Sequence, residues 1–244
     1  MPRSVTHFYT LITLLVAVSL IGCASVPART TGNDPFQGMN RRVYRFNESI
    51  DRNALKPMAT AYQHVTPNWM RTGVHNFFTH LGIPWTITNE LLQGKPQLMA
   101  QDTCRFVLNT VVGIGGFIDV AGKLELDSHD EDFGQTLAVW GVPSGPFLIL
   151  PLLGPSSLRD AAGLAPDYLA RPTQQISLPW QTSTAINMLN LVQTREALLS
   201  VDDALKGVFD PYGVVRDVWL QRREYLIYDG NPPITEIKEE NDSF

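Results

Sequence analysis

The residues with the clearest chemistry lie near the start of the chain, where the pattern is typical of a lipobox. It closes an uncharged stretch that begins at Phe8, and it consists of Leu20, Ile21, Gly22 and Cys23. At such a site a signal peptide is cleaved after a small residue and the following cysteine thiol is acylated. The apolar run is too short for a spanning helix of about 20 residues. We therefore expect residues 1–22 to be a signal peptide and Cys23 to be lipidated, rather than an uncleaved anchor or a plain secretory signal.

The lipid modification decides where the chain is held. A single acyl chain binds membranes only marginally, whereas several chains together hold a protein firmly. A bacterial lipoprotein cysteine carries several acyl chains, so we expect membrane attachment. Ala24 follows the cysteine, and the absence of Asp at this position favours the outer membrane. Residues 23–33 are small and polar, which predicts a flexible tether between the lipid and the fold.

The rest of the chain contains no enzymatic motif. The glycines of residues 113–116 do not form G-x-G-x-x-G, and Ser144 lies outside a G-x-S-x-G elbow. Four histidines lack the spacing of a metal site: His64, His75, His80 and His129. His129 belongs to the acidic segment 127–132, which is more simply interpreted as a solvated loop than as a metal site. We expect no catalytic residue, no metal and no cofactor.

Composition excludes further classes of function. The chain carries 19 basic and 24 acidic residues, and its first 22 residues contain one of the basic ones and no acid. The mature chain therefore has a net charge of −6 and lacks the basic surface that nucleic-acid binding needs. With Cys23 acylated, Cys104 is the remaining cysteine, so an intramolecular disulfide cannot form. We expect Cys104 to be buried as a small apolar residue.

The elements that must position these residues begin with an amphipathic helix. Residues 34–230 show no internal repeat and predict one domain. Asp34 and Pro35 predict the helix start, because proline is favoured at the first helical position. The apolar stripe that follows consists of Phe36, Met39, Val43, Phe46 and Ile50. Three basic residues lie off this stripe and predict either a solvated face or a contact with lipid phosphates: Arg41, Arg42 and Arg45.

Helical patterns also cover much of the remaining chain. Breaks are predicted at three prolines: Pro57, Pro67 and Pro84. The predicted helices are residues 69–80, 87–92, 185–205 and 210–226. Gly207 is a natural stop for the third of these helices, and Asp210 with Pro211 starts the fourth. Strand signals are scarce, and residues 231–244 predict an acidic, flexible tail.

Two long stretches are nearly free of charge. Residues 137–155 contain no charged side chain, and residues 106–122 contain only Asp119. Glycine and proline interrupt both stretches, so neither predicts a continuous spanning helix. On composition alone, burial in the core of a globular domain is the favoured interpretation. The alternative is broken backbone at membrane depth, where protein or a water-filled cavity satisfies the peptide groups.

A series of short blocks runs through the chain in a distinctive order. The first part holds Asp34-Pro35-Phe36-Gln37-Gly38-Met39-Asn40-Arg41, Leu55-Lys56-Pro57, Asn76-Phe77-Phe78, Leu92-Gln93-Gly94, Arg105-Phe106 and Leu108-Asn109-Thr110. The second part holds residues 113–122, residues 132–137, Gly145-Pro146-Phe147, Leu150-Pro151 and Leu158-Arg159-Asp160. In this order and spacing the blocks closely resemble the MlaA family of outer-membrane lipoproteins, also called VacJ, over roughly residues 34–228.

The resemblance implies both a fold and a function. The implied fold is all-α, a single ring-shaped helical domain embedded in one membrane leaflet with a central amphipathic channel. This favours the membrane interpretation of the two uncharged stretches. The implied function is removal of mislocalised phospholipids from the outer leaflet of the outer membrane of a Gram-negative cell. The phospholipids would pass to the soluble periplasmic lipid carrier MlaC for return to the inner membrane, which maintains lipid asymmetry. The family also associates with trimeric porins.

The resemblance further implies the residues of the phospholipid path. A gate beside the channel is expected in the loop formed by Gly141, Val142, Pro143, Ser144, Gly145 and Pro146. Phe46 and Asn47 in the first helix are expected to keep the channel correctly closed. The alternatives are an ordinary turn for the loop and a core contact for Phe46. Pro143 stands where relatives can carry glycine, which stiffens this loop.

Two other functions fit the same features. One is a structural lipoprotein that supports a porin without moving lipid, and the other is a phospholipid hydrolase at the same membrane. Lipid transfer has a simple physical basis, because a charged head group in hydrocarbon costs several kcal/mol and a polar path removes most of that barrier. No covalent chemistry is needed for such a step.

Overall fold

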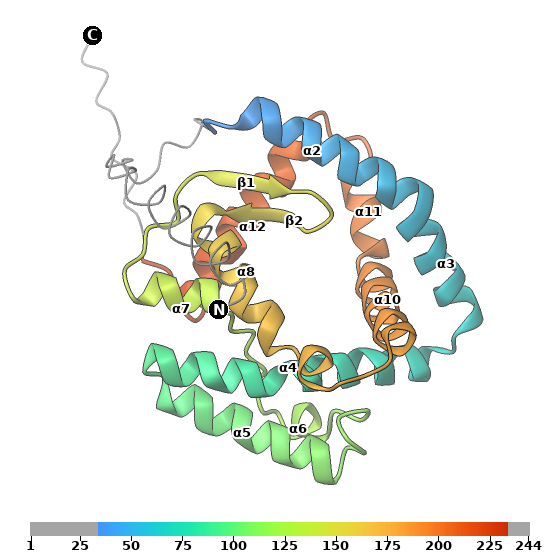
Figure 1. Cartoon of the computed structure of the whole chain (residues 1–244), viewed down its shortest axis with the longest axis vertical. Coiled ribbons are helices and arrows are strands. Elements are labelled where there is room, and N and C mark those ends of the chain that lie inside the picture. Colours follow the sequence, from blue (N-terminus) through green and yellow to red (C-terminus); the bar gives the residue numbers. More distant parts are fainter. Residues whose placement is uncertain (1–33, 234–244) are drawn as a thin grey trace, which may run out of the picture. The chain divides into compact units, whose positions relative to one another are not determined.

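The computed structural model describes residues 34–233 (Figure 1). The predicted signal peptide, the lipidation site Cys23 and the tether at residues 23–33 lie outside the described residues. The same holds for residues 234–244 of the predicted tail.

Helices dominate the described residues, so the predicted all-α class is confirmed. In chain order they are α2 (Gln37–Ile50), the π-helix η1 (Asp51–Leu55), α3 (Lys56–Val65), α4 (Asn68–Gln93), α5 (Pro96–Val111), α6 (Val120–Lys123), α7 (Phe133–Val139), α8 (Leu158–Ala170), α9 (Pro172–Gln175), α10 (Trp180–Ala197), α11 (Leu199–Leu205) and α12 (Pro211–Ile227). A short antiparallel hairpin between α7 and α8 is formed by β1 (Phe147–Leu150) and β2 (Gly154–Ser157). Its register pairs Phe147 with Ser157 and Leu150 with Gly154.

The packing between these elements closes into a circuit (Figure 1). α2 packs on β1, β2 packs on α8, α8 packs on α7, and α7 packs on α4. From α4 the contacts continue to α10 and then to α3, which leads back through η1 into α2. This closed order of contacts is what the predicted ring-shaped domain requires. α5 packs on α4 and α6, and α12 packs on α7 and β2.

The first helix begins later than the sequence predicts. α2 starts at Gln37, two residues beyond Pro35, and Asp34 Oδ1 accepts a hydrogen bond from the Phe36 N–H at 3.0 Å. Asp34 therefore fixes a turn before the helix instead of capping it. α2, η1 and α3 then follow one another directly, and Pro57 lies in the first turn of α3. The wider turn of η1 precedes this proline and accommodates its missing N–H, so the predicted break there is wrong.

The predicted break at Pro84 is also wrong. α4 continues through this proline as one helix, where the sequence predicts two shorter helices. Proline removes one helical hydrogen bond, but α4 packs against α5, α7 and α10, and these contacts outweigh the local preference. The break at Pro67 is confirmed, because this residue is the N-cap of α4.

The C-terminal helices follow the predictions with one interruption. The helix predicted at residues 185–205 is divided into α10 and α11, and it begins five residues earlier than expected, at Trp180. The division falls at Leu198, where ψ is −1°. Gly207 follows α11 with a positive φ of 82°, as the predicted stop requires. α12 begins at Pro211, as predicted.

The interior of the fold is polar and much of its exterior is apolar. Among the described residues, 16 polar or charged residues are buried but only seven hydrophobic ones, which reverses the usual preference of folded proteins in water. The same residues expose 37 large hydrophobic side chains. The apolar core is correspondingly small and consists of Phe147, Ile149 and Tyr212, with Val43, Tyr44 and Trp219 against it. Hydrogen bonds and ion pairs must therefore organise much of this fold.

The two uncharged stretches are buried only in part: Ala121, Phe147 and Ile149 are buried as composition alone favours, but other apolar residues of both stretches are exposed. Residues 106–122 end α5 and turn through a tip where Val111 is 76% and Ile114 is 73% exposed. Residues 137–155 include the hairpin, whose turn exposes Leu152 and Leu153. Within residues 34–233, no helix combines the length and the apolar character needed to cross a membrane.

The crossing of α7 and α8 depends on two glycines in close contact. A Cβ atom at Gly163 would lie 2.7 Å from Gly134 N and 3.1 Å from Gly134 Cα, and neither backbone atom can move without separating the helices. We expect Gly163→Ala to lower the free energy of unfolding by about 2–3 kcal/mol. Urea unfolding in a mild detergent, followed by circular dichroism, measures this change. Gly82→Ala is the matched control, because a Cβ there meets nothing within 4 Å and should stabilise α4 by about 0.5–1 kcal/mol. Equal stability of the two variants would contradict the close contact.

Candidate functional site

α4 and α5 pack with their polar faces inward. The buried residues of α5 are Asp102, Arg105 and Asn109, whose spacing places them on one helix face. α4 buries Gly73, His80, Ile83, Thr86, Asn89 and Glu90. The exposed hydrophobic residues of the two helices include Trp69, Phe77, Leu91, Val107 and Val111. Cys104 is exposed, because α5 turns its polar residues inward, so its predicted burial is wrong.

Asp119 ties α5 to the glycine-rich turn at residues 113–118. Its carboxylate accepts hydrogen bonds from Arg105 Nη2 at 3.0 Å and from Asn109 Nδ2 at 2.9 Å. Asn109 Oδ1 accepts the Ala121 N–H at 2.9 Å. Burial of Asp119 opposes its ionisation, but hydrogen bonds from a backbone N–H, Asn109 and Arg105 together lower the pKa of this carboxyl. The hydrogen bonds of Asp119 and Asn109 therefore hold the glycine-rich turn, whose apolar residues are exposed, against α5.

His80 fills the space between α5 and the same turn. Its ring stacks on Phe106 with the centroids 4.8 Å apart, and its Nε2 lies 3.1 Å from Thr110 Oγ1. Gly116 passes against the ring with a φ of +87°, and a Cβ there would lie 2.2 Å from His80 Cγ. The residue is 5% exposed, and this burial lowers the pKa of His80 below 6.5.

Acid is expected to destabilise the fold through His80. An unfolded histidine titrates near pH 6.5, so as the pH falls the unfolded state binds this proton before the folded state does. The stability present above about pH 6.5 is therefore lost between that value and the lower folded pKa. Unfolding midpoints in urea between about pH 7.5 and about pH 5 measure the effect. Relative to wild type, His80→Gln should lose less stability as the pH falls through this window, whereas His64→Asn, at an exposed position, should follow wild type. The comparison is made with wild type because carboxyl groups whose folded pKa is raised act in the opposite direction. An equally steep dependence in His80→Gln would assign the effect to other groups.

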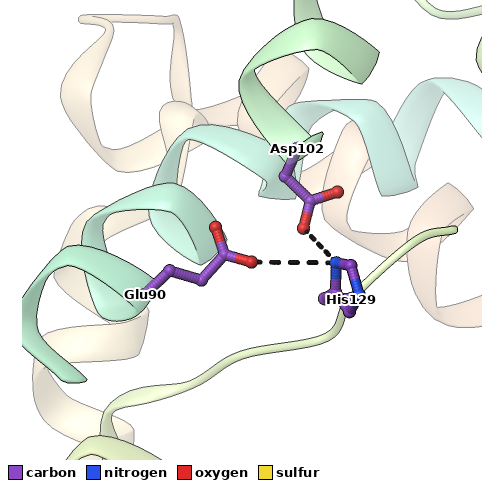
Figure 2. A group of neighbouring side chains, drawn as sticks. All are labelled: Glu90, Asp102 and His129. Carbon is purple, nitrogen blue, oxygen red and sulfur yellow. Dashed lines mark hydrogen bonds and ion pairs between the residues drawn. The ribbon is translucent and has the colours of Figure 1, made fainter. Parts of the chain in front are cut away.

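Three ionisable side chains from three elements meet near the C-terminal end of α4 (Figure 2). His129 Nδ1 lies 2.8 Å from Asp102 Oδ2 and 3.8 Å from Glu90 Oε1. The side chains of Glu90 and Asp102 are fully or almost fully buried, and that of His129 is 22% exposed. Burial, together with the neighbouring carboxylate of Asp102, raises the pKa of Glu90 to about 8. His129 thus belongs to a buried polar group rather than to the solvated loop that the sequence predicts.

Asn40 binds α2 to the hairpin. Its fully buried side chain donates from Nδ2 to the Phe147 carbonyl at 3.0 Å, and its Oδ1 accepts the Ile149 N–H at 2.9 Å. The amide therefore pairs with the β1 backbone as a neighbouring strand would. Asn40 Nδ2 also donates to Asp34 Oδ1 at 3.1 Å.

Asn47, a predicted site residue, makes the same kind of contact two helical turns later. Its Nδ2 donates to the Leu150 carbonyl at 2.9 Å, and its Oδ1 accepts the Leu152 N–H at 2.8 Å. These bonds hold the turn of the hairpin. Phe46 beside it is 52% exposed, so the alternative of an ordinary core contact for Phe46 is wrong.

The predicted gate loop, residues 141–146, connects α7 to β1 and is anchored at both ends. The Val142 N–H donates to the Leu137 carbonyl at 2.9 Å, which holds the loop to α7. The carbonyls of Ser144 and Pro146 accept backbone N–H groups from the start of α8, each at 3.1 Å. Gly141, Val142 and Pro143 are exposed between these anchors. The loop and Asn47 are attached to opposite ends of β1, so one strand links the two predicted parts of the site.

Sequence reasoning misses Arg223, which joins α12 to α7 and α8. Its guanidinium donates to Asp132 at 2.6 and 2.7 Å and to Asp160 Oδ1 at 2.7 Å. Asp132 also caps α7 by accepting the Gln135 N–H at 2.8 Å. Nothing in the local pattern marks Arg223. The available signal is that Asp132 and Asp160 belong to the MlaA-like blocks at residues 132–137 and 158–160.

Arg41 has a specific partner, which neither sequence interpretation provides. Its Nη1 and Nη2 donate to the two oxygens of Asp210 at 2.8 and 2.6 Å, and its guanidinium carbon lies 4.4 Å from the Tyr212 ring centroid. The hydrogen bond to Arg41 lowers the pKa of Asp210 to about 2. Since Asp210 immediately precedes α12, the pair joins the first helix to the last. Arg42 and Arg45 are exposed.

These features define a class: helical proteins with an apolar exterior, whose polar interior is held by hydrogen bonds and ion pairs. A family model described as MlaA lipoprotein matches residues 32–226. The chain therefore belongs to the MlaA lipoprotein family.

Individual relatives agree with this family. The intermembrane phospholipid transport system lipoprotein MlaA of Escherichia coli (strain K12) is 36% identical over 217 residues, covering 86% of this chain and 85% of that protein. The protein of the same name from Haemophilus influenzae is 30% identical over 235 residues, covering 93% of this chain and 92% of that protein. A solved structure described as the structural basis for maintenance of bacterial outer membrane lipid asymmetry superposes with a TM-score of 0.70 at 34% identity. That match covers 80% of this chain and 99% of the solved chain.

Proposed function

We propose that this protein is an outer-membrane lipoprotein that removes phospholipids mislocalised to the outer leaflet. It hands them to a periplasmic carrier for retrograde transport and so maintains the lipid asymmetry of the outer membrane. Membership of the MlaA family supports this function, and curated relatives are named as lipoproteins of an intermembrane phospholipid transport system. The structural observation that carries the proposal is the polar interior of residues 34–233, whose exterior carries 37 exposed large hydrophobic side chains.

This distribution suits a protein seated in one leaflet. Extended apolar patches are rare on proteins surrounded by water, because hydration of apolar surface is unfavourable. Contact with lipid tails would remove this surface from water. Short helices that lie within a leaflet need not span the bilayer. The polar interior would in turn offer a phospholipid head group the hydration that hydrocarbon denies it. Amphipathic surroundings of this kind lower the barrier to lipid movement without covalent chemistry.

The lipid is expected to pass along a path rather than to be stored. Two cavities beside α4 have volumes of about 190 and about 200 Å³. The first is lined in part by Arg71, His75 and Glu196, and the second in part by His80 and Arg105. Pockets for drug-sized ligands measure about 300–1,000 Å³, so neither cavity matches even such a ligand. Neither cavity could therefore hold a whole phospholipid by itself.

The proposal includes specific partners and positions. Three acyl chains on Cys23 would hold the chain at the periplasmic face of the outer membrane, beside a trimeric porin. The soluble carrier MlaC would take up the lipid. Residues 141–146 would form the gate, with Phe46 and Asn47 keeping the path closed in the absence of lipid. The attachment of both segments to β1 supports a shared action, because a shift of that strand would move both.

Deletion of the gene tests the function. Phospholipid at the cell surface is measured with an outer-leaflet phospholipase that acts only on exposed lipid. Deletion should raise the exposed amount, wild type should restore it, and Cys23→Ala should fail to restore it. Absence of a rise would refute the proposed function. Purified protein should release neither lysophospholipid nor fatty acid from vesicles, and release of either would favour the hydrolase.

Asn47→Ala is expected to raise exposed phospholipid toward the level of the deletion strain while the protein still reaches the membrane. The change removes both hydrogen bonds that hold the hairpin turn, and Asn47 is the side chain that joins this turn to α2. The same phospholipase assay, with protein abundance measured by immunoblot, detects the effect. Asn53→Ala is the control, because Asn53 is exposed and, within residues 34–233, its amide donates only to Ser49. Wild-type lipid levels in Asn47→Ala would separate the hairpin from lipid removal.

A further inference from the structure

Glu90, Asp102 and His129 form a side-chain cluster that the proposed lipid function does not use (Figure 2). Glu90 lies in the last turn of α4, Asp102 in α5, and His129 in the loop between α6 and α7. One ligand atom from each residue lies within 4.8 Å of those of the other two. In Figure 2 both carboxylates point toward His129 Nδ1.

The cluster has more acceptors than donors. Both oxygens of Glu90 and Oδ1 of Asp102 are buried without a hydrogen-bond partner. The side chains of Glu90 and Asp102 are 0% and 1% exposed. His129 Nδ1 lies near one oxygen of each carboxylate and cannot satisfy the others. Unpaired acceptors of this kind in a protein interior are destabilising, and two close carboxylates also repel each other.

The nearby cations do not hydrogen-bond to the two carboxylates. Arg105 Nε has no hydrogen-bond partner and forms a long ion pair of 3.9 Å with Asp102 Oδ1, while the other nitrogens of its guanidinium donate to Asp119 and to the Leu126 carbonyl. Lys95 Nζ donates to Glu131 at 3.0 Å and to Asp229 at 2.5 Å. Among the described residues, neither basic group donates a hydrogen bond to Glu90 or to Asp102 Oδ1, so the unpaired oxygens lie where a cation could bind.

We propose that Glu90, Asp102 and His129 bind a divalent transition-metal ion, with Zn²⁺ the best match to this donor set. Imidazole nitrogen and carboxylate oxygen are both zinc ligands, whereas Mg²⁺ and Ca²⁺ prefer oxygen ligands alone. Ligand atoms about 2.0–2.2 Å from a tetrahedral ion are about 3.3–3.6 Å apart, and the two distances at His129 Nδ1, 2.8 and 3.8 Å, bracket this range. His129 Nδ1 would bind in its unprotonated form, and its partial exposure leaves a fourth position for water.

The bound ion would act as a structural clamp. It would fasten the loop that carries His129 to α4 and α5. Two residues further on, Glu131 accepts hydrogen bonds from Gln93 at 2.7 Å and from Lys95 at 3.0 Å, and Asp132 then caps α7. The ion would therefore set the start of the helix that leads into residues 141–146.

Zinc titration of the full chain tests the site. Protein purified in mild detergent is stripped with a chelator, and Zn²⁺ binding is followed by calorimetry and by the thermal unfolding midpoint. One ion should bind per chain and raise the midpoint. Glu90→Gln and His129→Asn should each weaken binding by more than about 100-fold, since even outer-shell partners of a metal contribute 10–100-fold. Glu125→Gln and His64→Asn, at exposed positions, are the matched controls and should bind as wild type does.

A readout on the unmodified chain guards against variants that fail to fold. Co²⁺ added to the wild-type protein should give the visible absorption of a tetrahedral site, and Zn²⁺ should displace it. Absence of stoichiometric Zn²⁺ binding and of the Co²⁺ spectrum would overturn the proposal and leave a proton shared between the carboxylates. Binding of equal strength in folded Glu90→Gln and His129→Asn would also overturn it, because the ion would then lie elsewhere on the chain.

Discussion

Replacing Arg223 with methionine is expected to lower the free energy of unfolding by about 3 kcal/mol. The change leaves the buried carboxylate of Asp160 without its strongest partner and removes the bidentate bond to Asp132. Breaking a buried ion pair costs about 3–5 kcal/mol. The lower end applies here, because Asp132 is 37% exposed and Asp160 keeps its bonds to Arg159.

The neighbouring residue provides the control for Arg223→Met. Arg222 is 66% exposed and its ion pair with Asp130 is 3.9 Å long, so Arg222→Met should change the free energy by less than about 0.5 kcal/mol. Urea denaturation in mild detergent, followed by circular dichroism, compares the two variants with wild type. Similar stabilities for both would show that the junction of α7, α8 and α12 does not depend on this ion pair.

Asn40→Ala is expected to lower the free energy of unfolding by about 2–4 kcal/mol. The substitution leaves the Ile149 N–H and the Phe147 carbonyl of β1 without their partner. Each unsatisfied buried group costs about 1–3 kcal/mol. Alanine does not fill the space of the asparagine amide, so water can enter and partly replace the lost hydrogen bonds. The loss should therefore be larger than for most single substitutions.

The hairpin itself reports whether this explanation is correct. Hydrogen exchange of the Ile149 amide should accelerate in Asn40→Ala by more than the global loss of stability explains, because its acceptor is removed. Asn53→Ala is the matched control and should leave both stability and exchange near their wild-type values. Slow exchange at Ile149 in Asn40→Ala would mean that another group replaces the lost acceptor.

Local sequence signals predict those helices whose ends carry strong residue preferences. The start of α12 after Asp210 and the stop at Gly207 are examples. The continuous course of α4 through Pro84 could not be predicted in this way, because packing against three other helices overrides the preference of one residue. The interruption at Leu198 has no marking residue either.

Burial was the least predictable property. Cys104 follows the usual rule for a small apolar side chain in sequence, yet it is exposed because α5 turns polar residues inward. The hydrophobic pattern of a helix shows which face is apolar but not which medium that face meets. Composition alone favours burial of the uncharged stretches, whereas the family resemblance predicts an apolar exterior.

In the candidate site, too, some residues could be predicted from the sequence and others could not. Asn47 was predicted through the resemblance, and the structure adds its hydrogen bonds to the hairpin. Asn40 and Arg223 act through partners 107 and 91 residues away in sequence, and no local spacing reports such pairs. Likewise, Glu90 and Asp102 lie on separate helices, so their approach to His129 follows from the packing of α4 and α5.

The scarcity of buried apolar side chains has a thermodynamic consequence. The heat capacity increase on unfolding comes mainly from newly hydrated apolar surface and is about 12–15 cal/mol/K per residue for ordinary globular proteins. This domain leaves much of its apolar surface exposed in the folded state. Its heat capacity increase on unfolding in water should therefore be smaller. The stability of the domain in water should therefore vary less steeply with temperature than that of an ordinary globular protein of the same size.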